Sequence, residues 1–214
     1  MHDTGMGTVQ EPKPPEGRRE ANKRATRLAL RAAAARRITA DGVAKTRVAD
    51  IAADCGVSER TFFRYFTTKE QAALDPLVEW IDGIVSAIED APYAVPLFET
   101  ATRLIDQGKD DAFPFGPEQV QAGILYYAYP EMQLAFSANM ETFRSRVIDQ
   151  VATRTGTQPH DAFPRALGSA MSAAMLGVIE AWLLGGCQDD LWDLVAHVLV
   201  QAGDQLVRPV PRSG

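Results

Sequence analysis

The sequence contains few cysteines and histidines. It also lacks an uncharged apolar run of about 18 residues, the length that suggests a membrane span. It has 214 residues, with only two cysteines and three histidines. Cys55 and Cys187 lie far apart and form no Cys-x-x-Cys pair, so neither a disulfide framework nor a zinc site is predicted. The most apolar stretch, residues 168–186, is interrupted by Glu180. Residues 1–20 contain no apolar core of a signal peptide, so we expect a cytoplasmic protein.

Motifs of common enzyme sites are also missing. There is no Gly-x-Gly-x-x-Gly, no Walker loop, no Gly-x-Ser-x-Gly and no His-Glu-x-x-His. His160 lies in a proline-containing loop without a visible partner, and His197 lies in an apolar stretch typical of a packed core helix. We therefore expect no catalytic residue, no metal and no cofactor. An enzyme with a helical pocket is the remote alternative.

No segment alternates apolar and polar residues over the length of a strand, so β-structure is not expected. Apolar residues recur instead at helical spacing, between breaks rich in glycine and proline. The sequence predicts an all-α protein. Its helices are expected near residues 21–40, 46–55, 59–66, 69–89, 96–107, 117–129, 131–154, 163–184 and 189–207.

Charge is divided unevenly along the chain. Residues 1–75 carry 14 Lys and Arg against 10 Asp and Glu, whereas residues 76–214 carry 8 against 18. A basic first third on an acidic body is typical of a localised surface that binds a polyanion such as DNA. A solvated helix face would show the same charge, so charge alone leaves both interpretations open.

The segment GVSERTFFRYFTTKE, residues 56–70, is both aromatic and basic. Together with the preceding VADIAADC it predicts two short helices joined at Gly56, which is typical of a helix-turn-helix. Ser58 and Thr68 are expected to cap the helices that follow them, and Thr46 is a candidate cap for the first helix. Four apolar residues are expected to pack inward and fix the second helix: Ile51, Val57, Phe62 and Phe66.

The exposed side of the second helix is expected to enter the major groove of DNA. Arg60 or Arg64 suits a guanine edge, because a guanidinium can donate two hydrogen bonds to it. Thr61 offers a methyl group for thymine and a hydroxyl for phosphate. The residues expected on this side are Ser58, Glu59, Arg60, Thr61, Phe63 and Arg64.

Phosphate contacts are expected beside this helix. The Tyr65 phenol can donate to a phosphate, and Lys69 lies at the start of the next helix, where its ammonium and the backbone N–H groups would act together. Thr46 and Arg47 hold the equivalent place at the start of the preceding helix, and either can provide the cap and the phosphate contact. The alternative for the whole segment is an aromatic core helix with incidental charges.

This segment resembles the DNA-binding segment of the TetR family of bacterial transcriptional regulators, over residues 25–74. The family pattern often has Tyr where this chain has Phe63, often Thr where it has Arg47, and usually Ala where it has Cys55. Phe63 is therefore expected to make apolar contacts, and Tyr65 to take the phosphate. The residues that carry the resemblance are Ile51–Ala52, Gly56–Val57–Ser58, Thr61–Phe66 and Lys69–Glu70.

The resemblance implies a homodimeric, ligand-responsive regulator. Residues 163–184 are crowded with Ala, Gly and Ser, and residues 189–207 are apolar, so both are expected to form a two-fold four-helix interface. Burial within one subunit is the alternative. The implied domains are a lead-in at 1–19, a helix-turn-helix domain at 20–68, a ligand-binding and dimerisation domain at 69–208 and a tail at 209–214.

Aromatic and methionine residues of the body are candidates to line a pocket, with Tyr hydroxyls to orient a small apolar or aromatic ligand. Taken singly, each fits an ordinary core better than a pocket. The expected function is a repressor that such a ligand releases from a palindromic operator in double-stranded DNA; an activator and a ligand-independent DNA-binding protein are the alternatives. The pocket candidates are Phe98, Tyr126, Tyr127, Phe136, Met140, Phe143, Met171, Met175 and Trp182.

Overall fold

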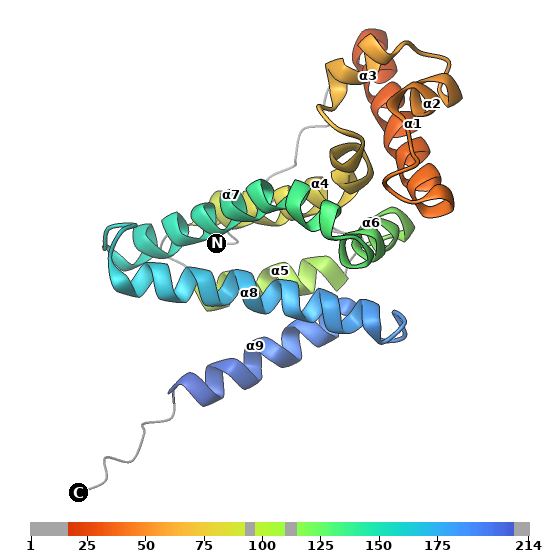
Figure 1. Ribbon diagram of the computed structural model, residues 1–214. Helices are drawn as coiled ribbons and strands as arrows, with labels where there is room; N and C mark the ends of the chain where they lie inside the picture. Colours follow the sequence, from red (N-terminus) through yellow and green to blue (C-terminus); the bar gives the residue numbers. More distant parts are fainter. Residues whose placement is uncertain (1–16, 93–96, 110–114, 208–214) are drawn as a thin grey trace, which may run out of the picture.

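A computed structural model describes residues 17–92, 97–109 and 115–207 (Figure 1). In these residues the chain forms nine α-helices and no strand, which confirms the all-α prediction. The expected helices all occur, with ends shifted by a few residues. They are α1 (Arg18–Asp41), α2 (Val48–Asp54), α3 (Glu59–Tyr65), α4 (Lys69–Asp90), α5 (Leu97–Lys109), α6 (Pro117–Ala128), α7 (Pro130–Thr155), α8 (Ala162–Leu184) and α9 (Leu191–Val207).

Side-chain caps start α3 and α4, as the sequence predicts. The Ser58 hydroxyl accepts a hydrogen bond from the Thr61 N–H at 3.2 Å, and the Thr68 hydroxyl accepts one from the Gln71 N–H at 3.1 Å. Each cap satisfies a backbone donor that the first turn leaves unpaired. Gly56 follows α2 with φ +65°, a left-handed conformation that glycine adopts without strain. These local features fix the turn between α2 and α3.

The prediction that Thr46 caps α2 is wrong. Arg47 is the N-cap residue, and no side chain makes a cap hydrogen bond there. Thr46 is only 4% exposed, and its hydroxyl donates to the carbonyl of Gly42 at 2.9 Å. The hydroxyl is therefore used inside the turn between α1 and α2, where it stabilises the entry to α2.

The helix-turn-helix is held by a small core at one end of the molecule (Figure 1). Phe62 of α3 is fully buried, as are Leu30 and Ile38 of α1 and Ile51 of α2. The rings of Phe62 and Phe66 lie 5.9 Å apart between centroids. Burial of these side chains fixes the angle at which α3 leaves the domain.

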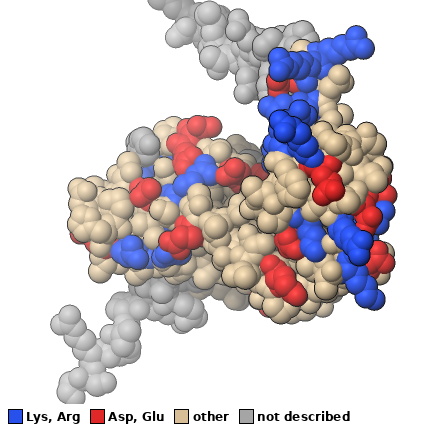
Figure 2. Space-filling view, turned by 45° about the horizontal axis from the view of Figure 1, so that its top comes forward, with Lys and Arg blue, Asp and Glu red and all other residues tan. Residues whose placement is uncertain are grey.

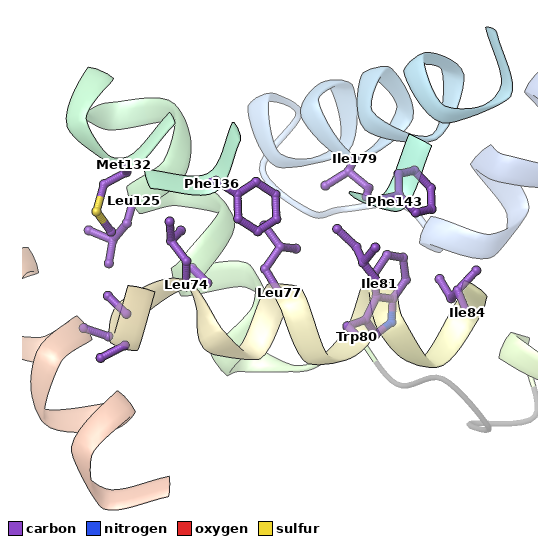
Figure 3. Packing of buried hydrophobic residues seen from close by; sticks show 14 of the residues in the cluster. Leu74, Leu77, Trp80, Ile81, Ile84, Leu125, Met132, Phe136, Phe143 and Ile179 are labelled. Carbon is purple, nitrogen blue, oxygen red and sulfur yellow. The ribbon is translucent and has the colours of Figure 1, made fainter. Parts of the chain in front are cut away.

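Helix α4 connects this domain to the body. Its first half packs on α1, and further along it contacts α6 and α7. Pro76 lies inside α4 and has no N–H to donate, so the regular helical hydrogen bond to Ala72 is missing and the helix is weakened there. Figure 3 shows Leu77 of α4 directed at Phe136 of α7 within the body core.

The body is a stack of helices around α4, with α7 and α8 running antiparallel as its closest pair. Gly168 of α8 allows this approach, because a Cβ atom there would lie 2.9 Å from the Cα atom of Ile148 in α7. Helices α5 and α9 contact each other within the body. One helix of the described part of the chain, α8, is long and apolar enough to cross a membrane, a property that core helices share.

Candidate DNA-binding surface and interior cavity

Helix α3 separates its aromatic rings into a buried and an exposed set. Phe62 and Phe66 are buried, whereas the neighbouring Phe63 is 53% exposed. Phe62 and Phe63 meet edge to face, with centroids 5.5 Å apart. The other predicted groove residues Ser58, Glu59, Arg60 and Arg64 are exposed, and Thr61 is half-buried.

Arg64 and Tyr65 form a unit at the end of α3. The Arg64 guanidinium lies 5.2 Å from the centroid of the Tyr65 ring, and its Nη2 atom is 3.5 Å from the phenol oxygen. Arg19 and Lys23 of α1 line the same shallow cleft as this pair. Figure 2 shows Lys and Arg gathered at this end of the molecule. The cleft therefore brings cationic groups of α1 and α3 to one side of the domain.

The basic side chains of α1 and of the turn before α2 are not all free to bind DNA. Arg37 donates two hydrogen bonds to Asp54, both at 2.7 Å, which ties α1 to the end of α2. This pairing lowers the pKa of Asp54 and raises that of Arg37. Arg36, Lys45 and Arg47, by contrast, are exposed. Arg47 is the N-cap residue of α2, and its contact with a phosphate stays a prediction.

The sequence suggests that Lys69 binds a phosphate, but in the structure its ammonium is hydrogen-bonded within the protein. Its ammonium donates to the carbonyl of Val43 at 2.6 Å and to that of Thr46 at 2.9 Å. It also lies 3.8 Å from a carboxylate oxygen of Glu70. An ammonium has three protons, so at most one is left for a phosphate. Lys69 joins the start of α4 to the turn between α1 and α2.

Replacing Lys69 with methionine should therefore lower the stability of the DNA-free protein. The substitution removes two charge-assisted hydrogen bonds and leaves two half-buried carbonyls without their donor, which together should cost roughly 2 kcal/mol. Thermal unfolding of the free protein measures this, with Lys45→Met as the control at an exposed position. An unchanged midpoint, together with a weaker salt dependence of DNA binding, would instead favour a role confined to phosphate binding.

The body contains an apolar cavity of about 80 Å³ between α4, α5, α7, α8 and α9. Three predicted pocket residues line it, namely Phe143, Met171 and Met175. The prediction missed its aliphatic wall, because isolated aliphatic residues give no signal that separates a cavity from a core. The remaining lining residues are Ile84, Ile88, Ala101, Leu104, Ile105, Val147, Ser172, Ala174, Val178, Trp192, Val195 and Val198.

The other pocket candidates do not line this cavity. Phe136 and Trp182 are buried in the core, and Met140 packs against it. Tyr126 and Tyr127 meet edge to face on α6, with centroids 4.8 Å apart. The side chain of Phe98, in α5, lies outside the described residues.

The two tyrosines contact helices that neighbour α6, and the Tyr126 ring lies 5.4 Å from the ring of Phe136 in α7. The Tyr127 phenol is directed at the carbonyl of Leu176 in α8, 3.5 Å away. Burial, with a contribution from the charge of Glu180, raises the pKa of Tyr127 to about 12. The pKa of Tyr126 is raised for the same two reasons. Both phenols therefore stay neutral at physiological pH, as expected for packing residues.

The cavity wall offers almost no polar group. Among the described residues that line it, only Ser172 and Trp192 have a side-chain N–H or O–H, and the Ser172 hydroxyl already donates to the carbonyl of Gly168 at 2.9 Å. In the same part of the chain no group of three His, Cys, Asp or Glu side chains could hold a metal ion. The pKa of the Cys55 thiol is raised by burial, so this thiol stays protonated near neutral pH.

Family models match both ends of this architecture. The model of bacterial regulatory proteins of the tetR family matches residues 30–73, which include the helix-turn-helix. The model of the MftR C-terminal domain, a TetR-type domain, matches residues 117–211. The chain belongs to the TetR family of transcriptional regulators. Members of this family are DNA-binding regulators, typically ligand-responsive repressors, and are generally not enzymes.

Solved structures of TetR-family regulators have the same fold. NalD of Pseudomonas aeruginosa, the secondary repressor of the MexAB-OprM multidrug efflux pump, is 17% identical, with a TM-score of 0.58 over 84% of this chain and 95% of NalD. A TetR-family regulator from Rhodococcus sp. is 21% identical, with a TM-score of 0.55 over 86% of this chain and 98% of that one. SmeT of Stenotrophomonas maltophilia, in complex with triclosan, is 16% identical, with a TM-score of 0.57 over 88% of this chain and all of the SmeT chain. No curated protein sequence matched the chain.

Proposed function

We propose that this TetR-family regulator is a homodimeric repressor that binds a palindromic DNA operator and is released by a small, uncharged apolar ligand. The surface of α3 carries this proposal. Phe63 is exposed there beside the exposed cations Arg60 and Arg64, while Phe62 behind them is buried. A short helix with that division suits the recognition helix of a helix-turn-helix.

The two arginines of α3 have different surroundings, which suggests different roles. Arg64 is held against Tyr65 and faces the cleft that also contains Arg19 and Lys23. This group suits consecutive phosphates of the DNA backbone. Arg60 lies one turn earlier, in the part of a recognition helix that meets base edges. Arg60 is therefore our candidate for bidentate recognition of a guanine.

Selection of bound fragments from genomic DNA with the purified protein tests the proposal. We expect a two-fold symmetric sequence. Arg60→Ala should weaken binding to it by about 1–3 kcal/mol and relax the base preference at one position of each half-site, whereas Arg64→Ala, which removes a phosphate-binding group, should weaken all sequences alike. Arg103→Ala, at an exposed arginine of α5, is the control. Binding that depends on salt but not on sequence would contradict the repressor function.

A second copy of the chain is our candidate to cover α8. A stripe of small residues along this helix is exposed, and Gly177 in its middle has no atom within 4 Å of where a Cβ would lie. Glycine at an exposed position inside a helix costs about 1 kcal/mol relative to alanine, so close approach of another helix is a physical reason for it. The exposed residues of the stripe are Ala166, Ala170, Ala173, Gly177 and Ala181.

The composition of the cavity wall favours an uncharged ligand. A carboxylate or ammonium enclosed there would lose its hydration without gaining a partner, which is strongly unfavourable. Phe143 and Trp192 contribute aromatic surface to the wall, and Met171 and Met175 contribute flexible thioethers that can adapt to a ligand. A ligand that enters would separate the helices around the cavity, move α4 and thereby alter the separation of the two α3 helices.

Naphthalene and 2-naphthoate form a matched pair of probes for the cavity. We expect naphthalene to raise the midpoint of thermal unfolding and 2-naphthoate to have little effect, because binding to the native state alone stabilises it by mass action. Ala174→Phe, which fills the cavity from α8, should abolish the shift. Equal stabilisation by both probes would contradict an uncharged pocket, and stabilisation by neither would favour the ligand-independent alternative.

A further inference from the structure

A buried arginine connects the DNA-binding domain to two helices of the body. The Arg31 side chain of α1 is only 9% exposed. Its Nη1 atom donates to Glu79 of α4 at 2.6 Å, and its Nη2 atom donates to Glu118 in the first turn of α6. Burial lowers the pKa of Arg31, but the Glu79 hydrogen bond and the Glu118 charge outweigh it, so the pKa is raised overall. The arginine therefore stays charged.

Two carboxylates of α4, one on each side of Pro76, lie near Arg31. Asp75, directly before Pro76, is buried, pairs with Arg27 of α1 and lies 3.7 Å from the Arg31 Nη1 atom. Glu79 lies after Pro76 and accepts the closer hydrogen bond from Nη1. A proline inside a helix weakens its rigidity, so α4 alone is a compliant link to α1. The contact with Glu118 bypasses this break.

The start of α6 is connected to the cavity by aromatic rings. Trp192 of α9 lines the cavity and lies 5.9 Å from Trp80 of α4 between ring centroids. Trp80 in turn meets Phe115 edge to face at 4.8 Å, and Phe115 meets Trp182 of α8 at 5.4 Å. Figure 3 shows Trp80 on the face of α4 that also carries Ile84, another lining residue.

Phe115 is held close to the first turn of α6. Gly116 is the N-cap residue of α6, and its N–H donates to the side chain of Gln119 at 3.0 Å. Pro117 occupies the first helical position, which fixes the backbone there. A displacement of the Phe115 ring therefore moves the turn that carries Glu118.

We propose that ligand occupancy is transmitted from the cavity to the DNA-binding domain through Trp192, Trp80, Phe115 and the start of α6, and that Glu118 passes it to Arg31. The proposal rests on the proposed function of the cavity and of α3. A ligand against Trp192 displaces the aromatic rings, and the start of α6 then moves away from Arg31. The ion pair between α1 and α6 is thereby broken.

The chain provides its own reporters of this route. It has three tryptophans, and all of them, Trp80, Trp182 and Trp192, belong to the aromatic cluster. None belongs to the helix-turn-helix. Coupling between two sites is reciprocal, so DNA bound at α3 must change the environment of the cavity. Fluorine NMR of the 5-fluorotryptophan-labelled full-length chain then reports whether DNA bound at α3 changes the surroundings of these tryptophans beside the cavity.

The experiment uses the operator fragment obtained by selection, and naphthalene as the cavity probe. In the wild type, saturating operator should shift the Trp80 and Trp192 resonances, and naphthalene should weaken operator binding by about 5-fold to 150-fold, the usual range of such coupling. Glu118→Ala should abolish the DNA-induced shifts and reduce the naphthalene effect to less than about 2-fold. Both ligands should still bind this variant, since Glu118 is half-exposed and its pair contributes little to folding.

Glu79→Ala is the matched control, because it removes the α4 carboxylate that is hydrogen-bonded to Arg31 but leaves the contacts with Asp75 and with α6. It should keep most of the DNA-induced shift. Phe115→Leu should reduce the shift, and combining it with Glu118→Ala should add nothing further, as expected for two residues in one route.

Several outcomes would overturn this route. One is an absence of tryptophan shifts when the wild type binds the operator. Another is a Glu118→Ala variant whose DNA-induced shifts and naphthalene effect equal those of the wild type. If the DNA-induced tryptophan shifts are lost in Glu79→Ala but kept in Glu118→Ala, the coupling runs through α4 and not through α6. Sequence-independent DNA binding is a separate result, because it contradicts the proposed function itself. If naphthalene fails to bind, the DNA-induced shifts still decide the role of Glu118.

Discussion

Replacing Phe62 with alanine should unfold the helix-turn-helix domain while the helical body stays folded. Phe62 is completely buried, and its ring packs against Phe63 and Phe66. Removing a buried phenylalanine costs about 3–5 kcal/mol, because apolar packing is removed and a cavity is left behind. A three-helix domain with a small core has little stability beyond that amount. Operator binding should therefore be abolished, and hydrogen exchange should increase in α1 to α3 but not in α7.

Phe63→Ala is the natural control for this experiment. The two positions are adjacent, but Phe63 is 53% exposed. Its removal should change the free energy of unfolding by less than about 0.5 kcal/mol, as is usual for surface positions. Operator affinity should nevertheless fall, because alanine cannot reach the base or sugar that the ring packs against. Equal destabilisation of both variants would mean that Phe63 is a core residue, and would contradict its assignment to the DNA surface.

Local sequence signals predicted the helix-turn-helix well, because its structure depends on short-range chemistry. Ser58 and Thr68 cap the helices that follow them, and Gly56 provides the left-handed turn. The alternation of buried Phe62 and exposed Phe63 follows from helical periodicity. Each of these features depends only on residues that are close together in the sequence, so the local sequence is enough to predict it.

Long-range contacts decided how several of the predicted residues are used. The Thr46 hydroxyl donates to the carbonyl of Gly42 and does not cap α2, and the Lys69 ammonium joins the α1–α2 turn to the start of α4. Tyr127 suits a pocket, but it contacts Leu176 of α8. Only the packing of distant helices distinguishes these uses, and no spacing in the sequence reports it. The role of Arg31 was not predicted for the same reason, because its carboxylate partners are 48 and 87 residues away.

Ala173→Arg should convert the proposed dimer to a monomer. Ala173 lies on the exposed stripe of α8 beside Gly177, where a second helix can approach closely. An arginine there would place its charge and bulk in the middle of the interface, where neither has a partner. Analytical ultracentrifugation measures the change. Ala138→Arg, at an exposed alanine of α7, makes the same substitution outside the stripe and should leave the dimer intact.

Dissociation of the dimer should have a large effect on DNA recognition. One helix-turn-helix reads only a half-site, and the dimer joins two of them at the spacing of successive major grooves. Operator affinity of Ala173→Arg should therefore fall by roughly 1000-fold, towards its affinity for unrelated DNA. Thermal unfolding at low concentration should show a folded monomer, because Ala173 is exposed in the single chain. A variant that remains dimeric and binds the operator normally would show that the second copy does not lie on this stripe, and the exposed Gly177 would then need another partner.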